Sequence, residues 1–128
     1  MRILLDTHTF LWFCQGSDHL GETVRQTIEE DTNLPLLSIV SIWEIAIKVS
    51  LGKLHLQQPF ETLIPLLLKQ NGIELLHVDI KHLFPLVNLP FHHRDPFDRL
   101  LIAQAMQERI PIVSMDAVFD SYPIERLW

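Results

Sequence analysis

Near the start of the chain stands Ile3-Leu4-Leu5-Asp6, a short apolar run that ends abruptly at a carboxylate. Neighbouring residues of a strand point to opposite faces, so an uninterrupted apolar run indicates a strand that is buried on both sides. Such strands are typical of parallel sheets covered by helices. The run is also too short for the apolar region of a signal peptide, because Asp6 interrupts it at once. This stretch therefore favours an α/β protein.

Other apolar runs along the chain extend this interpretation. We predict further strands at residues 34–38, 73–78 and 112–114, and a short fifth strand at residues 124–127. Helices are predicted at residues 7–14, 20–31, 59–70 and 79–85, from Ser38 or Ser41 to about 51, and from Asp95-Pro96 to about 108. Strands that alternate with helices form a parallel sheet with helices on both faces. We therefore expect a three-layer α/β/α fold with a central parallel sheet of four to five strands.

Length and composition narrow the class of protein. The 128 residues fit one domain, 1–128, and 48% hydrophobic with 20% charged residues excludes disorder. The net charge of −6 excludes nucleic-acid binding by bulk charge, so a polyanionic substrate requires metal ions or a local basic patch. A single cysteine, Cys14, forms no intrachain disulfide and fits the cytoplasm. No stretch reaches the ~18 apolar residues of a membrane span.

Two acidic residues follow predicted strands. Asp6 comes directly after the first strand, and Asp116 follows the strand at residues 112–114 after Met115. Open α/β sheets bind ligands beyond the carboxyl ends of their strands, where both acids are expected to lie. Each acid can equally serve as the cap of the next helix.

Glu44 lies in a segment that is apolar on nearly every face, 39–49, where a carboxylate must be compensated. Ser41-x-x-Glu44 matches a capping box, and Lys48 is placed for an i,i+4 ion pair. A cation in a shared acidic pocket is the third explanation. On this segment alone the two structural explanations are slightly favoured.

The stretch Asp95-Pro96-Phe97-Asp98-Arg99 opens the strongest helix. Proline suits the first helical position, which makes Asp95 the N-cap and Asp98 the third helical residue. Asp98 can then project from the helix start toward the sheet edge. We therefore favour Asp98 as a ligand, with Asp95 in a supporting position.

Together the four acids predict a metal site. Asp6, Glu44, Asp98 and Asp116 come from four separate segments, and each is expected to face one crevice. Clustered carboxylates repel one another unless cations occupy the site. Because all the ligands are oxygens, Mg²⁺ or Mn²⁺ is favoured.

At this point the sequence resembles a known family, the PIN domain, and more narrowly the VapC-type toxins of bacterial toxin–antitoxin pairs. The resemblance spans essentially the whole chain in the right order. Its motifs are Leu4-Leu5-Asp6-Thr7-His8 with Trp12, Ser41-Ile42-Trp43-Glu44-Ile45, the highly specific run from His93 to Ala105, and Ser114-Met115-Asp116.

The resemblance implies a metal-dependent endoribonuclease that cuts RNA and is held inactive by a cognate antitoxin. Asp6, Glu44 and Asp98 match the family's three main acids, and Asp116 matches its more variable fourth. Ser114 matches a small hydroxyl residue near the metal site. The resemblance also implies Mg²⁺ or Mn²⁺ as cofactor, products with a 5′-phosphate and a 3′-hydroxyl, and a homodimer.

Basic residues near the acids have two interpretations. Arg94, Arg99 and Lys48 can hold phosphates or serve as ordinary ion-pair partners. His92-His93 makes a poor zinc site without a nearby cysteine or third histidine, so we assign both to the surface or to RNA contact.

Aromatic residues near the motifs are assigned to the core. Trp12, Trp43 and Phe97 have apolar neighbours and are expected inside the protein rather than stacked on bases. His8 is placed to touch the site because it follows Asp6 closely.

Three other classes share parts of this pattern. A receiver domain requires paired acids after the first strand and a late lysine, but Asp6 stands alone and residues 114–116 hold no lysine. A haloacid dehalogenase-type phosphatase requires Asp-x-Asp, where this chain has Asp6-Thr7-His8. A catalytically inactive binding module remains the main alternative, although the intact acid set argues against it.

Overall fold

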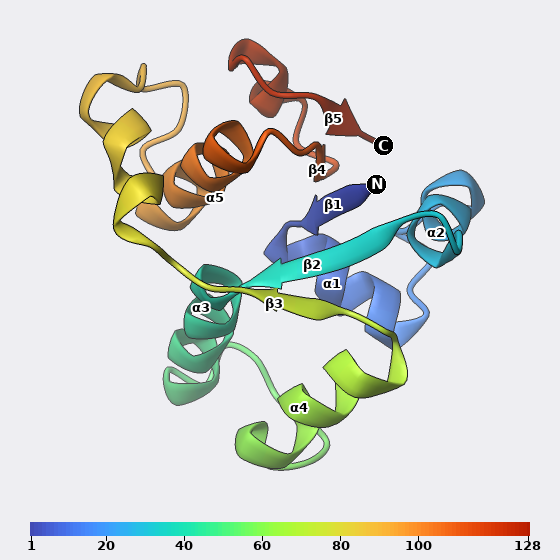
Figure 1. Cartoon of the computed structure of the whole chain (residues 1–128). Helices are drawn as coiled ribbons and strands as arrows, with labels where there is room; N and C mark the ends of the chain where they lie inside the picture. The colour runs from blue at the N-terminus through green and yellow to red at the C-terminus, as the bar shows by residue number, and fades with distance from the viewer.

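A single five-stranded sheet forms the centre of the computed structural model, which describes residues 1–128 (Figure 1). The strand order is β3-β2-β1-β4-β5, and every neighbouring pair is parallel. The strands are β1 (Arg2–Leu5), β2 (Leu34–Ser38), β3 (Glu74–Leu76), β4 (Ile112–Val113) and β5 (Arg126–Leu127). The predicted strand count and direction are confirmed.

Helices fill the connections, as the sequence predicted. They are α1 (Thr7–Gln15), α2 (Glu22–Glu29), α3 (Ile39–Ser50), α4 (Phe60–Gln70), α5 (Pro96–Glu108) and the 3₁₀ helices η1 (Ile80–Asn88) and η2 (Ala117–Ser121). Four elements differ from the predicted bounds by two residues or more, because β3 and β5 are shorter than predicted and two helices have shifted ends, and η2 was not predicted. The second helix starts at Glu22 because Leu20 is held in a turn by Ser17 and Gly21 is the N-cap. The helix after Asp79 continues through Pro85 to Asn88 as a 3₁₀ helix.

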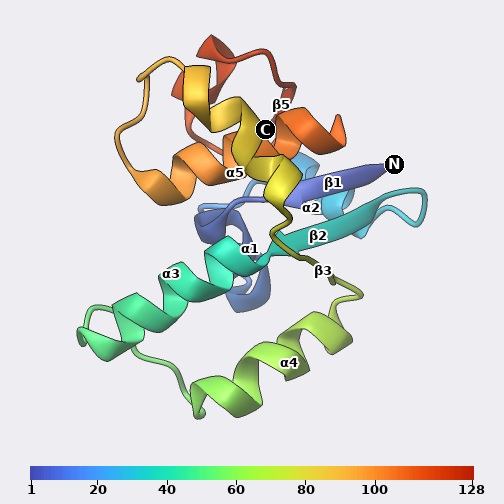
Figure 2. The same ribbon diagram turned by 60° about the vertical axis from the view of Figure 1, so that its left-hand side comes forward.

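Alternate residues of β1 pack into two separate hydrophobic clusters, one on each face of the sheet. Ile3 and Leu5 pack in a cluster that also draws on α1 to α4, whereas Leu4 points into a cluster with α5 and the 3₁₀ helices. Figure 2 shows α5 and η1 on one side of the strands and α1, α3 and α4 on the other. The three-layer architecture expected for strands buried on both faces is confirmed. None of the helices is long and apolar enough to cross a bilayer.

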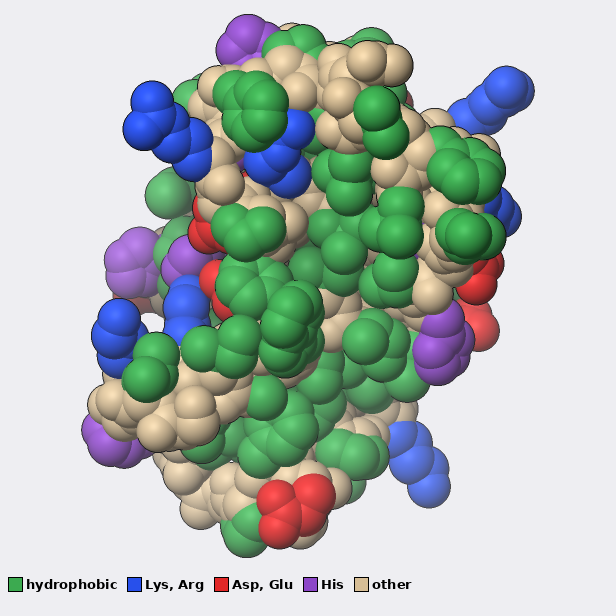
Figure 3. Space-filling view, turned by 90° about the vertical axis from the view of Figure 1, so that its left-hand side faces the viewer, with side chains coloured by type: hydrophobic (Ala, Val, Ile, Leu, Met, Phe, Trp, Pro, Cys, Tyr) green, Lys and Arg blue, Asp and Glu red, His purple; other side chains and the backbone are tan.

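One side of the molecule is broadly apolar, over α3 and η1 (Figure 3). Trp43 of α3 is 58% exposed, and Phe84 and Val87 of η1 are exposed as well. The prediction of Trp43 as a core residue is therefore wrong. Its ring meets the half-buried Phe97 edge-on at 5.0 Å between centroids, whereas Phe97 itself packs against the core, as predicted.

Candidate active site

A polar pocket of about 390 Å³ holds all four predicted site acids. Its lining residues are Asp6, Thr7, His8, Glu44, Lys48, Asp95, Asp98, Asp116 and Phe119. Asp6 follows β1 directly and Asp116 lies three residues beyond β4, so the pocket lies at the carboxyl edge of the sheet. The tertiary structure therefore brings together acids from four separate segments of the chain.

Asp6 and Asp116 both cap helices, as their position after strands allowed. The Oδ1 atom of Asp6 accepts the backbone N–H of Thr9 at 2.9 Å, at the start of α1. The Oδ1 atom of Asp116 accepts the N–H of Val118 at 3.0 Å, at the start of η2. Fully buried Ser114 supports this turn, because its Oγ accepts the N–H of Asp116 at 3.0 Å. Asp6 and Asp116 therefore each cap a helix and line the pocket at the same time.

Glu44 is held by two side chains. The buried Thr7 donates its hydroxyl proton to Glu44 Oε1 at 2.7 Å, and Lys48 Nζ lies 3.1 Å from Oε2. The i,i+4 ion pair is confirmed. The capping box of Ser41 with Glu44 is wrong, because Ser38 is the N-cap and Ser41 Oγ is buried without a hydrogen-bond partner. Glu44 thus lines the pocket and does not cap its own helix.

Asp98 is the most perturbed acid of the pocket. As predicted, Asp95 caps α5 by accepting the N–H of Phe97 at 2.8 Å, and Asp98 lies in the first turn. Burial first, and then the negative charges of Asp95, Glu44 and Asp6, raise the pKa of Asp98 to about 6, while His93 acts in the opposite direction. Like charges crowd at this carboxylate, and a cation would relieve their repulsion.

The donor set fits a hard divalent cation. Carboxylate oxygens are the ligands that Mg²⁺ and Mn²⁺ prefer. No three His, Cys, Asp or Glu side chains converge closely enough to form a ready cage. Mg²⁺ does not require one, because it usually keeps several waters and takes one or two carboxylates directly. Asp98 and Asp6, with Glu44 and Asp116 around them, offer that arrangement.

Two side chains that hold acids were missed by the sequence analysis. Thr7 is the buried partner of Glu44, and its place directly after Asp6 was the only available signal. His93 was assigned to the surface or to RNA contact, but its side chain is only 9% exposed and its Nε2 lies 2.7 Å from Asp116 Oδ2. That assignment is wrong for His93 and holds for the exposed His92.

The remaining predicted neighbours divide between surface and interior. His8 is exposed and lines the pocket, as expected. Arg94 is exposed outside the pocket lining. Arg99 is neither a phosphate ligand nor an ion-pair partner, because it is buried and donates to three backbone carbonyls. Trp12 is partly buried against the core, as predicted.

The fold and the pocket define a class: a parallel α/β/α protein with an acidic site at the carboxyl edge of its sheet. The sequence model of the PIN domain matches residues 3–125, nearly the whole chain. The chain belongs to the PIN domain family.

Two kinds of relatives accompany this match. Ribonuclease VapC16 of Mycobacterium tuberculosis is 38% identical over 67 residues, which are 52% of this chain and 47% of that protein. The chain thus matches about half the length of this curated relative. Among solved structures, VapBC2 from Rickettsia felis, bound to a DNA fragment from their promoter, has a TM-score of 0.70 at 14% identity, covering 99% of this chain and 98% of the other. FitAB bound to an IR36 DNA fragment has a TM-score of 0.66 at 17% identity, covering 98% and 93%. Both structures support the fold.

Proposed function

We propose that the chain is a metal-dependent endoribonuclease, the toxin of a type II toxin–antitoxin pair, which hydrolyses RNA phosphodiester bonds. The observation that carries this proposal is the gathering of Asp6, Glu44, Asp98 and Asp116 in one pocket of a PIN-family fold. The partial match to a ribonuclease supports the same activity. A receiver domain would require a second acid beside Asp6 and a lysine at residues 114–116, and this chain has neither.

The proposed roles follow from how each acid is held. Asp6 and Asp98 hold Mg²⁺ or Mn²⁺ directly, and Glu44 and Asp116 complete the site directly or through water. When bound, such an ion polarises the phosphate and lowers the pKa of an attacking water. Thr7 orients Glu44, and Lys48 offsets part of its charge in the pocket.

The proposal extends to partners and location. An active ribonuclease must be restrained, so we expect a cognate antitoxin, as the VapBC2 and FitAB complexes suggest. We also expect a homodimer, from the family resemblance, and a cytoplasmic location. RNA, the proposed substrate, is a polyanion, and a cation in the pocket offsets its repulsion from a chain of net charge −6.

The first prediction is that Asp98→Asn abolishes Mn²⁺-dependent RNA cleavage while the protein stays folded. The substitution removes the carboxylate whose charge is most destabilised by burial and by neighbouring acids, and it keeps the shape of the side chain. Cleavage of a labelled RNA, with circular dichroism of the same sample, measures both effects.

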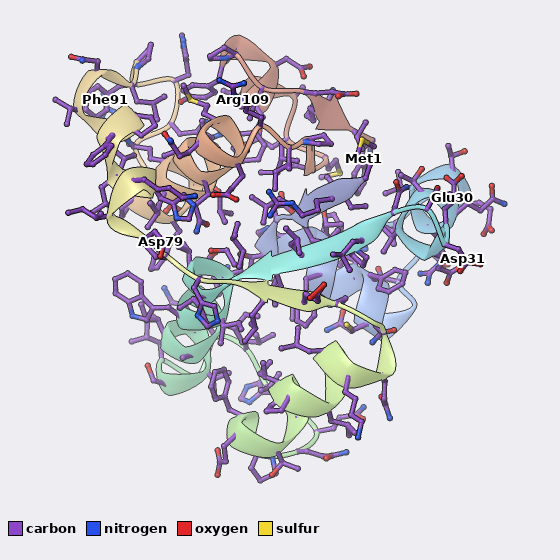
Figure 4. The ribbon with its side chains drawn as sticks, viewed as in Figure 1. Met1, Glu30, Asp31, Asp79, Phe91 and Arg109 are labelled. Carbon is purple, nitrogen blue, oxygen red and sulfur yellow. The ribbon has the colours of Figure 1, made fainter.

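Asp31→Asn is the matched control. It removes the same charge from an exposed acid that lies at the opposite end of β2 from the pocket (Figure 4). It should cleave like the unaltered chain. A catalytically inactive binding module, the alternative function, predicts no cleavage by any variant and no effect of EDTA. Undiminished cleavage by a contaminant-free Asp98→Asn preparation would contradict the site assignment.

A further inference from the structure

The loop between η1 and α5, residues 89–95, is held to α5 by hydrogen bonds from one buried side chain. The buried Arg99 donates from Nη2 to the carbonyl of Leu89 at 3.0 Å and from Nη1 to those of Pro90 at 2.9 Å and His93 at 3.2 Å. The ring of Phe91 covers the guanidinium at 3.9 Å, and Figure 4 shows Phe91 on the outer side of the molecule. The helix that presents Asp98 therefore also fixes the backbone of this loop.

His93 points from this loop between two partners. Its Nε2 lies 2.7 Å from Asp116 Oδ2, and its Nδ1 lies 3.1 Å from the hydroxyl of the buried Tyr122. The ring also packs against Phe119, with centroids 4.7 Å apart. Polar and apolar contacts thus leave the imidazole little freedom to turn.

For a neutral imidazole, one arrangement of protons satisfies all the hydrogen bonds of this group. In this arrangement the Tyr122 oxygen accepts the backbone N–H of His93 at 2.7 Å and the hydroxyl proton is donated to Nδ1. With Nδ1 as acceptor, the imidazole carries its proton on Nε2 and donates it to Asp116. The other oxygen of Asp116 already accepts the N–H of Val118. Both carboxylate oxygens are therefore held in place.

We infer that His93 is a positioning residue that orients the Asp116 carboxylate toward the acidic pocket, and that Tyr122 selects the imidazole tautomer which does so. The inference rests on the proposed function, because it assigns Asp116 a place in the metal site.

The tautomer is tested first, without metal or RNA. In long-range ¹H–¹⁵N spectra of the ¹⁵N-histidine-labelled chain, His93 should show the pattern of a proton on Nε2. Tyr122→Phe keeps the ring and removes the hydroxyl, so the pattern should shift toward a mixture of tautomers. A proton on Nδ1 in the unaltered chain would overturn the inference whether or not the protein cleaves RNA.

The positioning role is tested by Mn²⁺ binding, measured by calorimetry, and by RNA cleavage. His93→Ala should weaken Mn²⁺ binding about 10- to 100-fold, the usual effect of removing a group that orients a ligand. His93→Gln, whose amide N–H can reach Asp116, should restore binding to within a few-fold. His77→Ala, an exposed histidine outside the pocket, is the matched control and should bind Mn²⁺ like the unaltered chain.

The outcomes separate the two proposals. Unchanged Mn²⁺ binding by a folded His93→Ala variant, or failure of glutamine to restore it, would overturn the positioning role. If His93→Ala does not fold, Tyr122→Phe takes its place, and equal Mn²⁺ affinity in that variant despite a changed tautomer would overturn the role. An unaltered chain that neither binds Mn²⁺ nor cleaves RNA would instead defeat the proposed function, and the spectra would still decide the tautomer.

Discussion

The pocket acids differ in what holds them. Glu44 has a hydroxyl and an ammonium, Asp116 has an imidazole and a backbone N–H, and Asp6 has a backbone N–H. Asp98 is instead buried among negative charges, and burial first and then these charges raise its pKa to about 6. Three carboxylates of the site are thus held by hydrogen-bond donors, whereas the charged form of Asp98 is destabilised.

Thr7→Val should reduce Mn²⁺-dependent cleavage about 10-fold, because it removes a hydroxyl that orients Glu44 while keeping the side-chain shape. The free energy of unfolding should fall by about 1 kcal/mol, the usual contribution of one hydrogen bond. Cleavage rates and urea denaturation measure the two effects. Thr7→Ser keeps the hydroxyl and should retain most of the activity, and equal losses in both variants would contradict the orienting role.

Among the elements, α5 connects the site to the far side of the fold. Its first turn carries Asp98 and its last residue is Glu108, a negative charge that the helix dipole disfavours at this end. Three donors on other elements compensate it: Arg2 on β1 and Lys81 and His82 on η1. The hydrogen bond from His82, followed by those from Arg2 and Lys81, lowers the pKa of Glu108 to about 2.

This pKa predicts an acid-sensitive link between α5, η1 and β1. The folded-state pKa of Glu108 lies below the unfolded value near 4.5, so its stabilisation is fully present above about pH 4.5 and is lost as the pH falls toward 2. Free energies of unfolding measured across this range should fall less steeply for Glu108→Gln than for the unaltered chain. Parallel curves for the two proteins would contradict the assignment.

Helix and strand positions were largely predictable because the signals are local. Pro96 after Asp95 marked the start of α5, and Gly16, with a φ of 63°, ended α1 as predicted. Trp43 was misplaced because a local apolar pattern does not tell which face of a helix remains uncovered after packing.

For the whole molecule, folding gathers negative charge at one edge of the sheet, and this crowding affects stability. In metal-free buffer Asp98→Asn should raise the free energy of unfolding by about 1 kcal/mol, after allowance for solvent screening, because the cost of burying the charge and its repulsion with the neighbouring acids disappear. Mn²⁺ should then raise the melting temperature of the unaltered chain more than that of the variant, since binding to the folded state stabilises it.

Thermal unfolding with and without Mn²⁺, in chelator-treated buffer, measures both parts. Asp31→Asn serves again as the control and should leave both the metal-free stability and the Mn²⁺ response unchanged. A metal-free melting temperature that falls in Asp98→Asn would show that the carboxylate is not repelled in the folded state.

The sequence by itself determined the parallel α/β architecture and the four acids, because strand burial and strand ends are read from neighbouring residues. Only the tertiary structure decided how these acids are held. Asp116 and His93 are 23 positions apart, and Arg99 of α5 holds the loop that carries His93 where it can reach Asp116. Contacts of this kind depend on long-range packing, which no local pattern of residues encodes.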